Sequence, residues 1–250
     1  MRAEVVLTPS ESKRLIGKAV ASMDVVKKAL KSGLVIIGRG TTNSYIAEEI
    51  LGKTIEKGKY ARGIVYPDQI TLVPAEDALS EVIIENGKLS EKKLDEAVKG
   101  LKSGDVVIKG ANALDANGVS GVFIARNPQT TGGTVGLTYG PAVSRGGITF
   151  IIPVGLEKLI PGSIKDVVAE VGQDIAMSIG FVVGMLPTMG TVVTEIEAFK
   201  ILAGVEAINI GGGGVRGAEG ARIFLLKGDE KSVKKAFEMV KDIQGEPSVK

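Results

Sequence analysis

"VIIGRGTTNSYIAEEIL", residues 35–51, is the stretch from which the fold is argued. Together with Leu34 it begins as a run of four apolar residues, passes through a Gly-Arg-Gly-Thr-Thr-Asn turn and continues as an amphipathic segment. The apolar run predicts a strand that is buried on both faces of a sheet. The segment after the turn predicts a helix from about residue 42 to 51, which Gly52 ends. A strand that enters a helix through glycines is typical of a parallel α/β unit.

The turn is also a candidate anion site. The start of a helix presents backbone N–H groups without intrahelical partners, together with the positive end of the helix dipole. The dipole alone contributes about 0.3–1 kcal/mol, so hydrogen bonds would supply most of the affinity. The alternative is a tight turn capped by a threonine, because the third glycine of GxGxxG and the lysine of a P-loop are missing. The residues of the candidate site are Gly38, Arg39, Gly40, Thr41, Thr42 and Asn43.

Apolar runs and helical patterns alternate over the first two thirds of the chain. This order predicts an α/β main domain over residues 1–160, with a mostly parallel, Rossmann-like sheet flanked by helices. The other elements expected there are a helix over 8–31, strands at 63–66, 70–73, 81–84, 105–108, 119–125 and 148–154, and helices after Ser90 and within 130–147.

The composition changes after about residue 160. A helix at 194–204, two strands around GGGGVRGAEG (211–220) and a helix at 230–243 predict a small α+β layer, ferredoxin-like, over residues 161–250. The glycine-rich stretch is interpreted as a long hairpin connection. The alternative is a lid that brings Arg216, Glu219 and Arg222 over the main domain.

Composition limits the chemistry. The chain has 31 basic and 29 acidic residues and neither Cys nor His. A thiolate nucleophile, a Ser-His triad and a Cys/His zinc site are therefore excluded. The charge balance predicts no nucleic-acid partner and no membrane binding, and no apolar run is long enough to span a bilayer. We expect a cytoplasmic protein; the scarcity of Cys, Asn and Gln points to a thermophile, and a homo-oligomer is compatible with the sequence.

Three stretches stand in a suggestive order: residues 35–51, GDVVIKGANALDANG (104–118) and TTGGTVGLTYGPAVSRGGITFIIPVGLEKL (130–159). Together they resemble landmarks of the superfamily of ribose-5-phosphate isomerases, sugar-phosphate deaminases and CoA transferases, over about residues 30–160. The resemblance implies that the first glycine loop cradles a phosphate and that a small α+β layer accompanies the core. It also implies that a lysine, here Lys158, follows the last strand.

The sequence departs from the isomerase pattern where the acids belong. Lys109 and Asn112 stand in place of two acidic residues, and only Asp115 keeps its carboxylate. Thr131 replaces a lysine, and Gly140 stands near the position of the base glutamate. Loss of a positioned general base lowers the rate by about 10²–10⁴. We therefore do not expect isomerase activity by that mechanism.

Two further groups of residues are candidates for the site. Lys109, Asn112 and Asp115 follow a buried strand, so Lys109 is expected to pair with an anion and Asp115 to transfer a proton; the alternative is a polar loop whose Asn and Asp cap its own turns. A second set of anion contacts is expected at the next helix start, from Thr131, Gly132, Gly133 and Thr134.

Glu85-Asn86-Gly87 matches the setting of the nucleophilic glutamate in CoA transferases. Asn-Gly is also the favoured pair for a type I′ hairpin turn, and this interpretation is preferred.

The resulting hypothesis is a protein that binds a small phosphorylated or carboxylated metabolite at the carboxyl edge of the sheet. An enzyme would be an isomerase, lyase or transferase acting through Asp115 and Lys109. The alternatives are a ligand-sensing module of the same fold and a purely structural subunit. Neither a cofactor nor a divalent metal at Asp115 can be assigned from the sequence.

Overall fold

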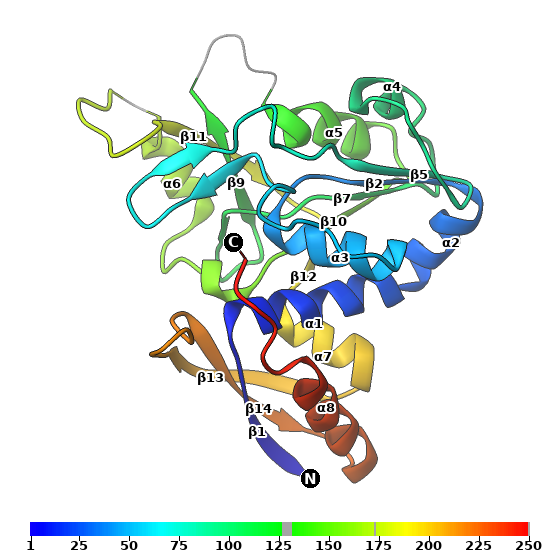
Figure 1. The fold of residues 1–250 in the computed structure, drawn as a ribbon, viewed down its shortest axis with the longest axis vertical. Helices are drawn as coiled ribbons and strands as arrows, with labels where there is room; N and C mark the ends of the chain where they lie inside the picture. The colour runs from blue at the N-terminus through cyan, green and yellow to red at the C-terminus, as the bar shows by residue number, and fades with distance from the viewer. Residues whose placement is uncertain (127–131, 173, 250) are drawn as a thin grey trace.

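The computed structural model describes residues 1–126, 132–172 and 174–249 and shows a mixed α/β chain (Figure 1). Its largest sheet consists, in spatial order, of β12 (Thr191–Val193), β10 (Thr149–Pro153), β7 (Val106–Ile108), β2 (Leu34–Ile37), β5 (Val82–Glu85) and β6 (Lys88–Leu89). The strands from β12 to β2 are parallel neighbours, whereas β5 runs antiparallel to β2 and forms a hairpin with β6. The sheet is therefore mixed, and the expected Rossmann-like, mostly parallel sheet is not confirmed.

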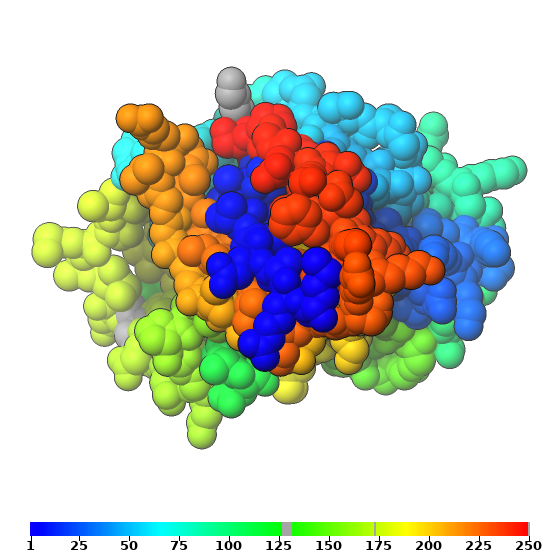
Figure 2. Space-filling view, turned by 90° about the horizontal axis from the view of Figure 1, so that it is seen from below, coloured from blue at the N-terminus to red at the C-terminus, as the bar shows by residue number. Residues whose placement is uncertain are grey.

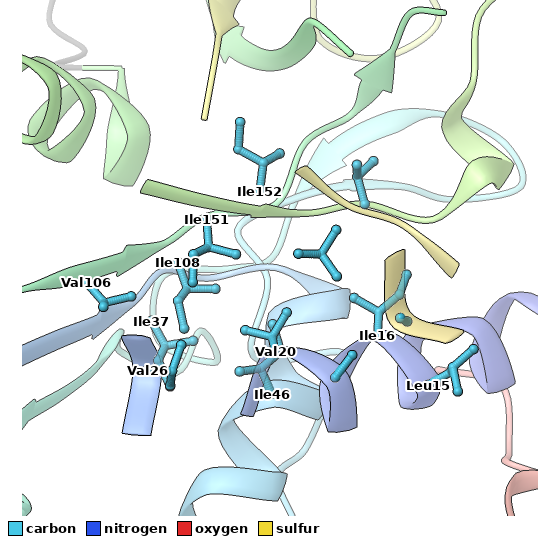
Figure 3. Packing of buried hydrophobic residues seen from close by; sticks show 14 of the residues in the cluster. Leu15, Ile16, Val20, Val26, Ile37, Ile46, Val106, Ile108, Ile151 and Ile152 are labelled. Atoms are coloured by element: carbon cyan, nitrogen blue, oxygen red, sulfur yellow. The ribbon is translucent and has the colours of Figure 1, made fainter. Parts of the chain in front are cut away.

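Helices cover both faces of this sheet (Figure 1). On one face lie α1 (Pro9–Ser22), α2 (Asp24–Ser32) and α3 (Thr41–Leu51), and on the other lie α4 (Leu94–Lys99) and α5 (Gly133–Ser144). The central strands are buried along their whole length, which explains their continuous Val and Ile runs. Figure 3 shows Ile37, Ile108 and Ile151 of the sheet near Val20 of α1 and Ile46 of α3. None of the helices in the described part of the chain is long and apolar enough to cross a membrane.

The single helix expected over residues 8–31 is two helices. Its predicted start is confirmed, because the Thr8 side chain accepts from the Glu11 amide and the Glu11 carboxylate accepts from the Thr8 amide. Met23, with φ −61° and ψ 136°, separates α1 from α2. The Ser22 hydroxyl donates to the Ala19 carbonyl, a local bond that competes with helix continuation.

The C-terminal part builds a second layer below α1 (Figure 1). Its antiparallel sheet has the order β1 (Arg2–Leu7), β14 (Ala221–Lys227) and β13 (Glu206–Gly213), and its helices are α7 (Glu195–Ala203) and α8 (Glu230–Ile243). Figure 2 shows the first residues of the chain on this layer, between the β13–β14 hairpin and the C-terminal residues. Because β1 comes from the start of the chain, the layer is not a ferredoxin-like unit made of residues 161–250 alone. The division at residue 160 stays a prediction.

Smaller elements complete the described chain. They are the antiparallel sheet of β8 (Ala113–Leu114), β9 (Ser120–Ala125) and β11 (Val183–Thr188), the hairpin of β3 (Gly63–Val65) and β4 (Ile70–Leu72), α6 (Ile164–Glu170) and the 3₁₀ turn η1 (Leu156–Lys158). The strand expected at 119–125 is confirmed as β9, but it lies in this separate antiparallel sheet. The Asn86-Gly87 turn is confirmed, since both residues have positive φ (47° and 80°) between β5 and β6.

Candidate functional site

Three parallel strands end side by side at one edge of the main sheet. Gly38 follows β2 and its amide donates to the Ile108 carbonyl (2.8 Å). Lys109 follows β7 and its amide donates to the Ile151 carbonyl of β10 (3.0 Å). Lys158 follows β10 in the turn η1. The structure therefore brings the first glycine loop and both lysines of the sequence-based site to the same edge of the sheet.

The start of α3 presents free backbone donors at this edge. The Gly40 amide is not among them, because it donates to the Tyr60 carbonyl (2.7 Å). Within the described residues, the amides of Thr41, Thr42 and Asn43 have no protein acceptor. Of the candidate residues 38–43, those at 41–43 therefore offer free backbone amides in the described part of the chain, whereas the Gly38 and Gly40 amides are already bonded.

Two buried oxygens at the same helix start also lack partners. Thr42 Oγ1 and Asn43 Oδ1 make no hydrogen bond, although the two residues are only 3% and 0% exposed. Asn43 Nδ2 donates to the Gly38 carbonyl (2.7 Å), so this side chain ties α3 to the end of β2. Unpaired polar atoms inside a protein are rare and call for an explanation.

Lys109 and Lys158 are half-buried at this edge. Their ammonium groups donate to neighbouring backbone carbonyls, Lys109 Nζ to Gly110 (3.0 Å) and Lys158 Nζ to Ala111 (2.9 Å). Neither lysine takes part in any of the ion pairs found among the described residues.

The electrostatic surroundings disfavour the charged form of both lysines. The pKa of Lys109 is lowered to about 8, mainly by burial and in addition by the nearby cation of Lys158, while Glu81 opposes this change. The pKa of Lys158 is also lowered to about 8, mainly by burial and in addition by Lys13, while the charges of Glu157 and Glu195 oppose this change. Two half-buried ammonium groups, neither of which forms an ion pair among the described residues, are an unusual arrangement for a purely structural region.

Glu81 connects two residues of the predicted site and was not identified from the sequence. Its Oε1 accepts from Arg39 Nε (2.9 Å) and from Thr134 Oγ1 (2.6 Å). Because β5 runs antiparallel to β2, the residue just before β5 lies at the carboxyl end of β2. An acidic residue directly before an apolar run was the available signal, but the direction of β5 was needed to interpret it.

Gly38 is required for the close packing at this point. A Cβ built on Gly38 would lie 2.8 Å from Thr134 Cγ2 and 2.9 Å from Lys109 Cδ. The bare backbone of Gly38 therefore lets the stems of Lys109 and Thr134 approach the end of β2.

The second glycine stretch is described only from Gly132 onward, and Thr131 lies outside the described residues. Gly132 and Gly133 both have positive φ (80° and 61°), and α5 begins at Gly133. In this stretch, the Thr134 hydroxyl is connected with Arg39 of the first glycine loop, because both donate to Glu81.

Asp115 and Asn112 bind backbone amides. Asp115 is 4% exposed and accepts from the amides of Asn117, Val119 and Ile164 at 2.9–3.0 Å. Burial would raise the pKa of Asp115, but these three amides together lower it. Asn112 Oδ1 accepts from the amide of Phe123 (2.9 Å). Asp115 thus has the turn-stabilising contacts of the alternative interpretation, with the amides of Asn117 and Val119, whereas the contact of Asn112 reaches across to β9.

Glu85 lies at the other end of the sheet. It is paired in register with Leu34, at the beginning of β2, whereas Gly38 follows the end of that strand. Its carboxylate binds Lys92 Nζ (2.7 Å), and this contact lowers the pKa of Glu85. The structure therefore agrees with a turn residue that is remote from the candidate site.

The turn that carries Lys158 is held by the C-terminal layer and α1. Both carboxylate oxygens of the fully buried Glu195 accept from the Leu156 amide (2.9 and 3.2 Å), and burial raises the pKa of Glu195. Arg222 Nη2 of β14 donates to the Leu156 carbonyl (2.6 Å). Lys13 of α1 pairs with Glu157 (2.7 Å). Sequence reasoning missed Glu195 and Lys13, and it considered Arg222 only in the alternative interpretation of residues 211–220 as a lid.

Within residues 1–126, 132–172 and 174–249, no group of three or more Asp or Glu side chains is arranged to hold a metal ion. Scans against protein-family models and curated proteins found no match to this chain. The resemblance to the isomerase and CoA-transferase superfamily stays a prediction.

Proposed function

We propose that the chain binds a small metabolite with a phosphate or carboxylate group at the carboxyl edge of β2, β7 and β10. The observation that carries this proposal is the pair of half-buried lysines, Lys109 and Lys158. Among the described residues, the hydrogen-bond acceptors of their ammonium groups are backbone carbonyls only. Burying two like charges is unfavourable, and a bound anion would relieve both the desolvation and the repulsion.

The start of α3 would supply the remaining contacts. Its three free amides and its dipole favour a negative group, and charge-assisted hydrogen bonds are stronger than neutral ones. The unpaired Thr42 hydroxyl would gain a partner in the same step. Arg39 and Thr134 already donate hydrogen bonds to Glu81. We therefore expect them to lie at the border of the site and not to bind the anion directly.

An NMR titration with inorganic phosphate tests the proposal. The amide signals of Thr41, Thr42 and Asn43 should move, and affinity should fall as the pH rises above about 8, because both lysines then lose their protons. Lys109→Met should weaken phosphate binding by roughly tenfold or more. The control Lys53→Met, at an exposed lysine just after the end of α3, should have no effect. Signals that move elsewhere and leave 41–43 unchanged would contradict the site.

The chain would be either an enzyme or a sensor of its ligand. As an enzyme it would be a sugar-phosphate isomerase, lyase or transferase. The contacts of Asp115 favour the alternative, a non-catalytic sensing module, because a carboxylate that accepts three amides and has a lowered pKa is a weak proton acceptor. Catalytic turnover of a small phosphorylated carbonyl compound would show that the chain is an enzyme and not a sensing module.

A further inference from the structure

Lys109 is held in a defined position at the candidate site. Its stem lies against the backbone of Gly38, next to Thr134. Its ammonium group has one hydrogen-bond acceptor among the described residues, the adjacent Gly110 carbonyl. The carbonyl oxygen of the preceding residue, Ile108, accepts a hydrogen bond from the Gly38 amide. It also lies 3.4 Å from Asn43 Nδ2 of α3. Lys109 is thus beside the proposed anion without being tied to a carboxylate.

The charges around Lys109 differ from those around Lys158. Cations, Lys158 and Arg39, oppose protonation of Lys109, and the nearby Glu81 is already bound to Arg39 and Thr134. Lys158 instead has two carboxylates nearby, Glu157 and Glu195, which favour its charged form against the opposing cation of Lys13. Burial next to another cation is the arrangement that makes a lysine amine nucleophilic.

We infer that Lys109 forms a Schiff base with a carbonyl compound that carries a phosphate or carboxylate, with Lys158 and the start of α3 holding the anionic group. The inference rests on the proposed anion site and names a reaction for it. The ligand class is a small keto acid or a phosphorylated aldehyde or ketone.

The reaction balances without a further reactant. The neutral amine of Lys109 attacks the carbonyl carbon and gives a carbinolamine. The carbonyl oxygen then leaves as one water molecule with two protons that came from the amine nitrogen, and a C=N bond replaces the C=O bond. With its pKa at about 8 instead of 10.5, Lys109 holds roughly 300-fold more neutral amine near pH 7 than an ordinary lysine.

Borohydride trapping tests this inference on the whole chain. Glyoxylate and glycolaldehyde phosphate are small aldehydes that carry the two kinds of anion, and borohydride converts their imines into stable secondary amines. Peptide mass spectrometry should locate the label on Lys109, at pH 7, at least about tenfold ahead of any exposed lysine such as Lys53. Inorganic phosphate should suppress the label on Lys109 and leave that on Lys53 unchanged.

Lys109→Arg should lose the label, whereas Lys53→Arg should keep it on Lys109. Should the arginine variant not fold, the position of the label in the wild-type chain still decides. Labelling in proportion to exposure, or on Lys158 without Lys109, overturns the Schiff base. If phosphate shifts the amides of 41–43 but neither aldehyde labels Lys109, the Schiff base is rejected and the anion site stands. If phosphate does not bind there either, both are rejected.

Discussion

Lys109 should reduce the stability of the folded protein although it contributes to anion binding. Its folded pKa of about 8 lies below the unfolded value of 10.5, so the folded state disfavours the charged form. This penalty is fully present below about pH 8 and disappears as the pH rises from there to about 10.5, because the unfolded chain binds more protons in that window.

Lys109→Met should therefore stabilise the protein by about 1–3 kcal/mol at pH 7, while phosphate binding weakens by roughly tenfold or more. Denaturant unfolding of both proteins at pH 7 and pH 10.5 measures the difference, which should shrink at the higher pH. A variant that is less stable at pH 7 would show that Lys109 is a structural residue.

Asp115 is expected to act on stability and not on the ligand. In Asp115→Asn an amide NH₂ replaces one acceptor oxygen and faces the backbone N–H of Ile164 or of its neighbours. The loss of that acceptor should destabilise the chain by about 1–3 kcal/mol at pH 7 and leave phosphate affinity within a few-fold. Because the pKa of Asp115 is lowered, its own stabilisation should vanish only as the pH falls below the ordinary value of 3.8.

Thermal unfolding and phosphate titration of Asp115→Asn, compared with the exposed Asp68→Asn, check this expectation. A large loss of an enzymatic activity with unchanged stability would return Asp115 to a catalytic role.

At the scale of elements, the junction of β2, α3 and α5 depends on one glycine. A methyl group on Gly38 would press on Thr134 Cγ2 and Lys109 Cδ, both within 3 Å of the built Cβ. Gly38→Ala should thus cost about 1–3 kcal/mol of stability and displace Lys109, so that phosphate binding weakens. Gly63→Ala is a matched control, because a Cβ there meets no atom within 4 Å. An alanine variant that binds phosphate like the wild type would separate Gly38 from the site.

The same elements show what the sequence can predict. Strand β2, the turn after it and helix α3 follow from local signals: a short Val/Ile run, glycines and Gly52 in the left-handed conformation at the end of the helix. The break at Met23 and the antiparallel direction of β5 depend on tertiary packing, so periodicity does not reveal them. For this reason Glu81 was missed, while Lys109 and Lys158 were found from their positions after buried strands. The partners of Asp115 are backbone amides, and residue type alone does not indicate them.

For the whole molecule, the arrangement of layers links the C-terminal sheet to the candidate site. β1 supplies an edge strand to that sheet, and its partner β14 carries Arg222, whose guanidinium reaches the Leu156 carbonyl in the turn of Lys158. The sequence patterns suggested a separate small domain, because a strand pairing between residues 2–7 and 222–227 leaves no local signal. The consequence is that a residue of the C-terminal layer helps to hold the turn that carries Lys158.

Arg222→Met should reveal this link. The methionine keeps part of the apolar stem but removes the bond to Leu156, which should lower stability by about 1.5–3 kcal/mol. Since the turn of Lys158 then loses one of the contacts that hold it, phosphate affinity should fall several-fold even though Arg222 is not part of the anion site.

Lys227→Met is the control on the same strand. Its partner Glu206 is exposed, so this ion pair contributes little to stability, and both measurements should stay near the wild-type values. Denaturant unfolding and phosphate titration of the two variants give the answer. If Arg222→Met lowers stability but leaves phosphate affinity unchanged, the C-terminal layer stabilises the fold without positioning Lys158.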